Sequence, residues 1–146
     1  MSFIEELQKI IEGYLPGEED LKRNLIVIYL FGSYAKNTGK PASDIDLAFV
    51  FFDDFYRNDS FLALQKAEML CLDINKKTHK SVDVVVMNST SLTFAFHIIR
   101  EAICVYEKCA AGRILYEIGV DNKYQDFAPF IKELRDIKRK SLLGSN

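Results

Sequence analysis

Residues 31–50 read FGSYAKNTGKPASDIDLAFV, and this stretch decides the fold because it joins two apolar runs of strand length. The first run is Leu25–Phe31, and the second is Ile45–Phe52. The intervening GKPAS segment is typical of a loop. A connection this short predicts that the two strands are antiparallel neighbours, so that the end of the first lies beside the start of the second.

The polar residues of this stretch fall where the two strands are expected to meet. Gly32 and Ser33 follow the first strand, and a turn or short helix is expected to begin near the serine. Asp44 and Asp46 open the second strand. Because strand side chains alternate, both aspartates are expected to point to one face while Ile45 points to the other. The sequence therefore predicts two carboxylates beside a glycine-serine turn.

A third acid is expected at the same end of the sheet. The segment SVDVVVM, residues 81–87, is rich in β-branched residues and predicts a third strand with Asp83 near its start. Residues 60–76 have the apolar spacing of a helix, and a helix between two strands favours a parallel crossover that returns to the same end. Asp83 is then expected beside Asp44 and Asp46. The alternative is a solvated aspartate on an edge strand.

The whole pattern predicts an α/β (α+β) fold, in which a small mixed β-sheet is flanked by helices. A length of 146 residues suits one domain, so residues 1–146 are expected to form a single unit. The remaining expected elements are a helix from a Ser2–Glu5 capping box to Pro16, a helix over 92–99, a strand over 103–106, and a helical C-terminal extension from about residue 108 with interruptions at Gly119 and Pro129.

Composition excludes several functional classes. The net charge is −2 and the pI about 5.7, so direct nucleic-acid binding is not expected. No apolar run approaches the roughly 20 residues that span a bilayer, and the N-terminus lacks the basic region of a signal peptide. The three cysteines follow no zinc spacing and are expected to be reduced thiols. We therefore expect a cytoplasmic protein.

Three clustered carboxylates repel one another unless they are protonated or a cation lies between them. Oxygen-only ligands suit Mg²⁺, which binds through a few carboxylates and substrate phosphates. Gly32 and Ser33 would bind the phosphates, because glycine allows a close backbone approach and amides at a helix N-terminus attract anions. Two metal ions about 4 Å apart activate an attacking oxygen and stabilise a leaving one. This combination indicates nucleotidyl transfer.

Gly32-Ser33, ten further residues and then Asp44-Ile45-Asp46 resemble the G-S-x10-D-x-D signature of the polymerase-β nucleotidyltransferase superfamily. The sequence is most similar to its minimal nucleotidyltransferases, and Asp83 resembles their third acid. The stretches CVYEKCAAGRILYE and YQDFAPFIKEL resemble the C-terminal half of members that are paired with HEPN toxins. The resemblance covers residues 25–135. It departs at residues 101–102, where Glu-Ala replaces the Glu-Gly of the family.

The resemblance implies a polymerase-β-like fold and transfer of AMP from ATP to a tyrosine hydroxyl of a partner HEPN ribonuclease toxin. The chain would thereby act as the antitoxin. Asp44 and Asp46 would hold two Mg²⁺ ions, and Asp83, also a metal ligand, would help to activate the tyrosine oxygen. Gly32 and Ser33 would bind the triphosphate.

Two other functions stay open from the residues themselves. The chain could neutralise a toxin by masking it without catalysis, although a pure binder gains nothing from clustered acids. It could instead transfer a nucleotide to a small molecule such as an aminoglycoside. A basic run near the C-terminus has two interpretations: a docking face for a partner, or a solvated surface. Its members are Lys132, Arg135, Lys138, Arg139 and Lys140.

Several other polar residues have two interpretations each. Lys36 and Lys40 would touch either phosphates or water, and Tyr34 would pack in the protein or stack on a base. His97 falls off the apolar stripe of its helix and is expected to be exposed. The acids at 53–54 lie at the far end of the second strand, where they are expected to form a solvated turn.

Overall fold

A computed structural model describes residues 1–36 and 43–143, and within them the strands form one four-stranded sheet of order β3-β2-β1-β4. These strands are β1 (Leu25–Phe31), β2 (Ile45–Phe51), β3 (Val82–Val86) and β4 (Ile103–Glu107). The expected α/β (α+β) class is confirmed, with a mixed sheet flanked by helices. Lys40 and the rest of the expected GKPA loop lie outside the described residues.

Helices occupy most of the remaining described chain: α1 (Phe3–Tyr14), α2 (Glu19–Asn24), α3 (Asp53–Asn58), α4 (Ser60–Thr78), α5 (Leu92–Glu101) and α6 (Ala110–Leu142), with short 3₁₀ turns at Leu15–Gly17 and Met87–Ser89. The capping prediction for α1 is confirmed, since the Ser2 hydroxyl accepts a hydrogen bond of 3.2 Å from the backbone N–H of Glu5. No helix within the described residues is both long enough and apolar enough to cross a membrane.

The register of β2 against its two neighbours confirms both predicted pairings. β1 and β2 are antiparallel, and Phe31 lies opposite Asp46. β2 and β3 are parallel, and Asp46 lies opposite Asp83. The α4 crossover thus returns the chain to the end of the sheet at which β1 finishes, as a helical connection between parallel strands should.

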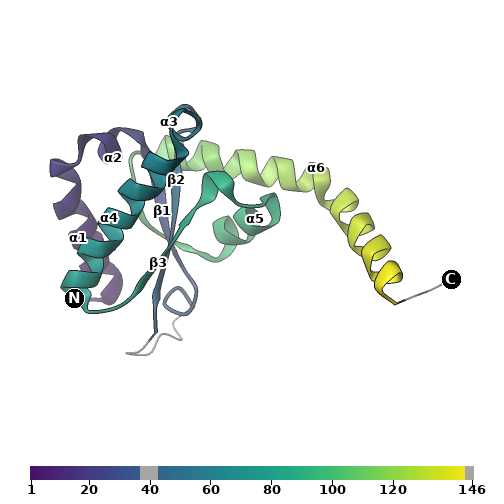
Figure 1. Cartoon of the computed structure of the whole chain (residues 1–146), viewed down its shortest axis with the longest axis horizontal. Coiled ribbons are helices and arrows are strands. Elements are labelled where there is room, and N and C mark those ends of the chain that lie inside the picture. Colours follow the sequence, from purple (N-terminus) through teal and green to yellow (C-terminus); the bar gives the residue numbers. More distant parts are fainter. Residues whose placement is uncertain (37–42, 144–146) are drawn as a thin grey trace.

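Alternating residues of β2 supply two apolar cores, one on each face of the sheet. Ile45, Leu47 and Phe49 are fully buried with residues of α1 and α4, whereas Ala48 and Val50 pack with residues of α5 and α6. Figure 1 shows α1 and α4 on one side of the strands and α5 on the other. A strand buried on both faces explains why the sequence of β2 is almost continuously apolar.

Helix α6 corrects one expectation, because it runs without interruption through both Gly119 and Pro129. Proline lacks the N–H of a helical hydrogen bond, so it bends a helix more readily than it ends one when the flanking turns are helical. Figure 1 shows the resulting bend, beyond which α6 projects away from the sheet. Val120 is the one buried residue of α6 within the described chain.

Asn88 completes the sheet where β3 has ended. Its side-chain oxygen accepts a 2.9 Å hydrogen bond from the N–H of Phe51, and its amide nitrogen donates at 2.8 Å to the carbonyl of the same residue. The amide also donates to Asp53 at 3.2 Å. One side chain thus replaces the peptide group that a longer β3 would have offered to the end of β2.

The two halves of α6 should respond differently to the same substitution. We expect Val120→Asp to lower the free energy of unfolding by about 3 kcal/mol or more, because it places an unpaired charge in the core. Ile137→Asp, in the exposed half, should change it by about 0.5 kcal/mol or less. Urea denaturation measures both, and a large loss for Ile137→Asp would show that the end of α6 packs against the body.

Candidate active site

Three carboxylates gather where β1 ends and β2 and β3 begin. Asp46 and Asp83 are direct partners across the parallel strands, and Asp44 lies immediately before β2. Asp46 has the same alternation as Ala48, which packs with α5 and α6, so the acids belong to that face of the sheet. The structure thus brings together the acids that the sequence predicted, while their catalytic role remains a prediction.

Gly32 allows the turn after β1 to approach Asp46 closely. Its φ is +74°, in the left-handed region that glycine favours. A Cβ atom at this position would collide with the Oδ2 atom of Asp46. The turn continues to Lys36, whose N–H donates a 3.2 Å hydrogen bond to the carbonyl of Gly32. The glycine of the Gly-Ser pair is therefore required by backbone conformation and by the space that the carboxylate occupies.

The carboxylate of Asp46 is electrostatically unfavourable in the folded chain. Partial burial is the largest cause that raises its pKa, followed by repulsion from Asp83, a hydrogen bond with Asp83, and repulsion from Asp44. Asp44 and Asp83 are exposed, so Asp46 bears most of the desolvation. A bound cation would remove this cost, because opposite charge favours the ionised form of a carboxyl group.

The donor chemistry of the three acids fits a hard cation such as Mg²⁺, since all available ligand atoms are oxygens. Among the described residues, however, no group of three or more His, Cys, Asp or Glu side chains is arranged so that it could hold a metal ion. Asp46 lies opposite Asp83 across the parallel strands, while Asp44 is exposed. Asp44 and Asp46 would hold the cation, and Asp83 on β3 would complete the set of ligands.

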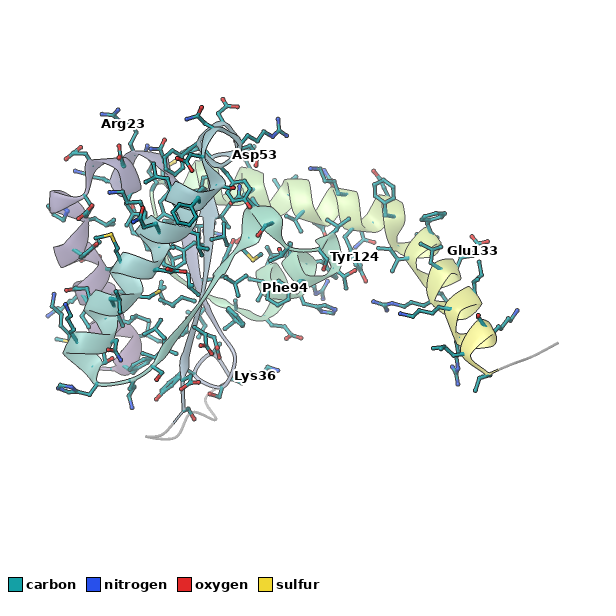
Figure 2. All side chains as sticks on the ribbon, in the orientation of Figure 1. Arg23, Lys36, Asp53, Phe94, Tyr124 and Glu133 are labelled. Carbon is teal, nitrogen blue, oxygen red and sulfur yellow. The ribbon has the colours of Figure 1, made fainter. Side chains whose placement is uncertain are left out.

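A small cavity beside the turn was not expected from the sequence. It measures about 210 Å³ and is lined by residues of the turn, including Gly32 and Lys36, and by residues of α5, including Phe94 and His97. The Phe94 ring meets Phe31 edge-on at 5.8 Å between centroids, which fixes α5 against the end of β1. Figure 2 shows Phe94 on α5 and Lys36 at the turn. His97 is exposed, as predicted, yet it borders the candidate site.

The remaining polar predictions have plain structural outcomes. Tyr34 stacks on Phe3 of α1 at 4.5 Å between ring centroids, which supports the packing interpretation. Asp53 and Asp54 are exposed at the far end of β2, but they begin the short helix α3 and do not form a turn. Ala102 caps the end of α5 with φ −80°, a conformation that needs no glycine. The one departure from the expected family pattern is therefore accommodated.

Comparison with known proteins identifies similar chains. A family model described as "Polymerase beta, Nucleotidyltransferase" matches residues 9–110, whereas no curated protein matches. A crystal structure of a toxin-antitoxin with AMP-PNP is 21% identical with a TM-score of 0.64, covering 90% of this chain and 98% of that one. The toxin-antitoxin MntA-HepT is 18% identical with a TM-score of 0.60, covering 92% and 98%.

A third solved structure contains the tri-AMPylated HEPN toxin of Shewanella oneidensis in complex with its MNT antitoxin. Its matching chain is 19% identical with a TM-score of 0.57, covering 90% of this chain and 98% of that chain. At these identities the likeness to solved structures establishes the shared fold.

The contact between Gly32 and Asp46 predicts a measurable coupling. Gly32→Ala should lower the free energy of unfolding by about 2 kcal/mol, through the left-handed φ and the collision with the carboxylate. In an Asp46→Ala background the same change should cost about 1 kcal/mol less, because the colliding atoms are gone. A double-mutant cycle in urea measures this coupling, and strictly additive losses would contradict the contact.

Proposed function

Because the chain belongs to the polymerase-β nucleotidyltransferase family, whose model matches residues 9–110, we propose that it is an Mg²⁺-dependent nucleotidyltransferase that transfers AMP from ATP to a tyrosine hydroxyl of a HEPN toxin. It would thereby act as the antitoxin of that toxin. The observation that carries the proposal is the pairing of Asp46 with Asp83 beside the Gly32 turn, which places two carboxylates and a glycine turn at one end of the sheet.

The solved structures of similar fold support the choice of nucleotide and acceptor. One of them holds AMP-PNP, an analogue of ATP, and another contains a HEPN toxin that carries AMP groups. These are properties of those proteins, and we extend them to this chain as part of the proposal. The extension agrees with the three acids that lie at one end of this chain's own sheet.

The proposed chemistry assigns a role to each residue. Asp44 and Asp46 would hold the Mg²⁺ ions, with Asp83 as a further ligand, while backbone groups of Gly32 and Ser33 would bind the triphosphate of ATP. When bound, Mg²⁺ neutralises phosphate charge and lowers the barrier to displacement. The tyrosine oxygen bonds to the α-phosphorus as the bond from that phosphorus to the bridging oxygen breaks, and pyrophosphate leaves. Asp83 accepts the proton of the tyrosine hydroxyl.

The exposure of the acids favours an acceptor on the surface of another protein. Asp83 lies on the edge strand β3 and is exposed, and Asp44 is exposed as well. A small acceptor would gain little binding energy at such an open site, because small-molecule sites enclose most of their ligand. A folded toxin brings its own surface and can present a tyrosine directly to Asp83.

Loss of the first two acids should separate catalysis from masking. We expect Asp44→Asn with Asp46→Asn to leave the protein folded, since it removes like charges, and to abolish AMP transfer, since amides bind Mg²⁺ poorly. The wild type and the double variant are each co-expressed with the toxin, and the intact mass of the toxin is measured. The wild type should add whole AMP units, and the variant none.

Asp54→Asn is the control, because Asp54 is an exposed acid at the opposite end of β2 and should leave transfer unchanged. The catalytic proposal is wrong if two results occur together: the double variant still rescues growth, and the toxin co-expressed with the wild type keeps its unmodified mass. The chain would then act by masking the toxin.

Asp83 should affect turnover much more than nucleotide binding. In Asp83→Ala, the affinity for ATP should stay within about threefold, while single-turnover AMP transfer should fall by about two decades or more, the scale of a lost general base. Asp54→Ala again serves as the control. ATP affinity is measured by calorimetry and AMP transfer by quenched flow. A near-normal rate of transfer in Asp83→Ala would show that Asp83 takes no part in the reaction.

A further inference from the structure

The C-terminal half of α6 carries an apolar stripe that its own chain does not cover. Phe127, Phe130, Leu134 and Ile137 are between 50% and 57% exposed, although all four are large and apolar. Their spacing of three, four and three residues places them on one face of the helix, as in the seam of a helical coiled coil. Four such residues on one face are more than the scattered exposed side chains of an ordinary surface.

The body of the protein ends its contact with α6 before this stripe begins. The ring of Tyr124 stacks on Phe96 of α5 at 3.7 Å between centroids, and no described residue after Tyr124 belongs to either apolar core. Figure 1 shows the end of α6 projecting past the rest of the molecule. The apolar side chains of this segment gain no burial from their own chain, so a partner that covers them would add the free energy of that burial.

Charge indicates what kind of partner this is. Residues 127–143 contain five basic and two acidic residues, a net charge of +3, whereas the whole chain carries −2 and the rest of it therefore −5. At roughly 100° per residue, Lys138 lies along one edge of the stripe, whereas Arg139 lies on the opposite face of the helix. The complementary surface is apolar in the centre with acidic residues at its rim.

A second copy of the same segment fits less well. It would bring another net charge of +3 against the first. Two helices that meet through four side chains each also bury far less than the roughly 1,200–2,000 Å² of a stable interface. A groove between two helices of a different protein contacts both sides of the stripe and buries more area.

We propose that residues 127–143 form the docking element for the toxin, seated in an apolar groove with an acidic rim on the toxin surface. The identity of the partner rests on the proposed function; the apolar and basic character of the element does not. Because α6 leaves the sheet at the end opposite the three acids, docking and transfer use separate parts of the chain. Docking would raise the effective concentration of the tyrosine at the active site.

The test measures affinity for the toxin in the Asp44→Asn, Asp46→Asn background, so that no modification takes place during binding. Phe130→Glu with Leu134→Glu should raise the Kd at least tenfold. The matched control is Ile114→Glu with Ile118→Glu, an equally spaced pair on the same helix with similar exposure of 44% and 50%, which should change the Kd by less than twofold. Circular dichroism and urea midpoints verify that both variants are folded.

A second variant tests the charge. Lys138→Glu, beside the stripe, should also raise the Kd about tenfold and reduce the dependence of the Kd on salt concentration. With the active enzyme, the stripe variant should raise the KM for the toxin and leave transfer at saturating toxin nearly unchanged.

Other outcomes would overturn the docking proposal. These are an unchanged Kd for the stripe variant, no binding of the toxin by the wild type, or a wild-type dimer in sedimentation that becomes a monomer in the stripe variant. The last result would show that a second copy covers the stripe. If the toxin binds through the stripe but gains no AMP, the docking proposal is correct and the catalytic proposal is wrong. If AMP is transferred equally well by the wild type and the stripe variant, the catalytic proposal is correct and the docking proposal is wrong.

Discussion

The register of β2 is the constraint on which the candidate site depends. Ile45, Leu47 and Phe49 are fully buried against α1 and α4, and this fixes which face of the strand Asp46 occupies. A slip of one residue would turn the carboxylate into that core and expose the apolar side chains. The same register places Asp46 between Phe31 and Asp83. The acids are therefore positioned by the burial of their apolar neighbours.

The position of Asp46 is electrostatically unfavourable for a carboxylate. Asp46 is partly desolvated and next to a second carboxylate, so its pKa is raised, and the Gly32 turn lies against its Oδ2 atom. A sheet built for stability alone would have an apolar residue at this position. The cost is understandable if the acids hold a cation during the reaction, since the charge that destabilises the free protein then contributes to binding.

Much of this arrangement could be predicted because its elements are strongly patterned. The strands around Asp46 and Asp83 are rich in apolar and β-branched residues, and the helix between them favours a parallel crossover. The helix α2, the cavity beside His97 and the continuity of α6 through Pro129 could not be predicted. A six-residue helix has too few turns for a clear period, a cavity depends on how two elements pack, and a bend at proline depends on the helix that flanks it. The Cys109 thiol, which caps α6 by accepting from the N–H of Gly112, also lacks the usual sequence signal of a cap.

Deamidation of Asn88 would have a structural consequence, because its side chain pairs with the end of β2. Asn88 is followed by Ser89, a small residue that hinders attack of its own backbone nitrogen on the amide carbon very little. Hydrolysis to aspartate would replace the donor that serves the Phe51 carbonyl with an acceptor, and would set a second negative charge beside Asp53. An unsatisfied carbonyl at a sheet end costs about 1–3 kcal/mol. Slow deamidation at this one position would therefore loosen the end of β2 that lies farthest from the acids, so that an ageing preparation would lose stability before it lost the geometry of its carboxylates.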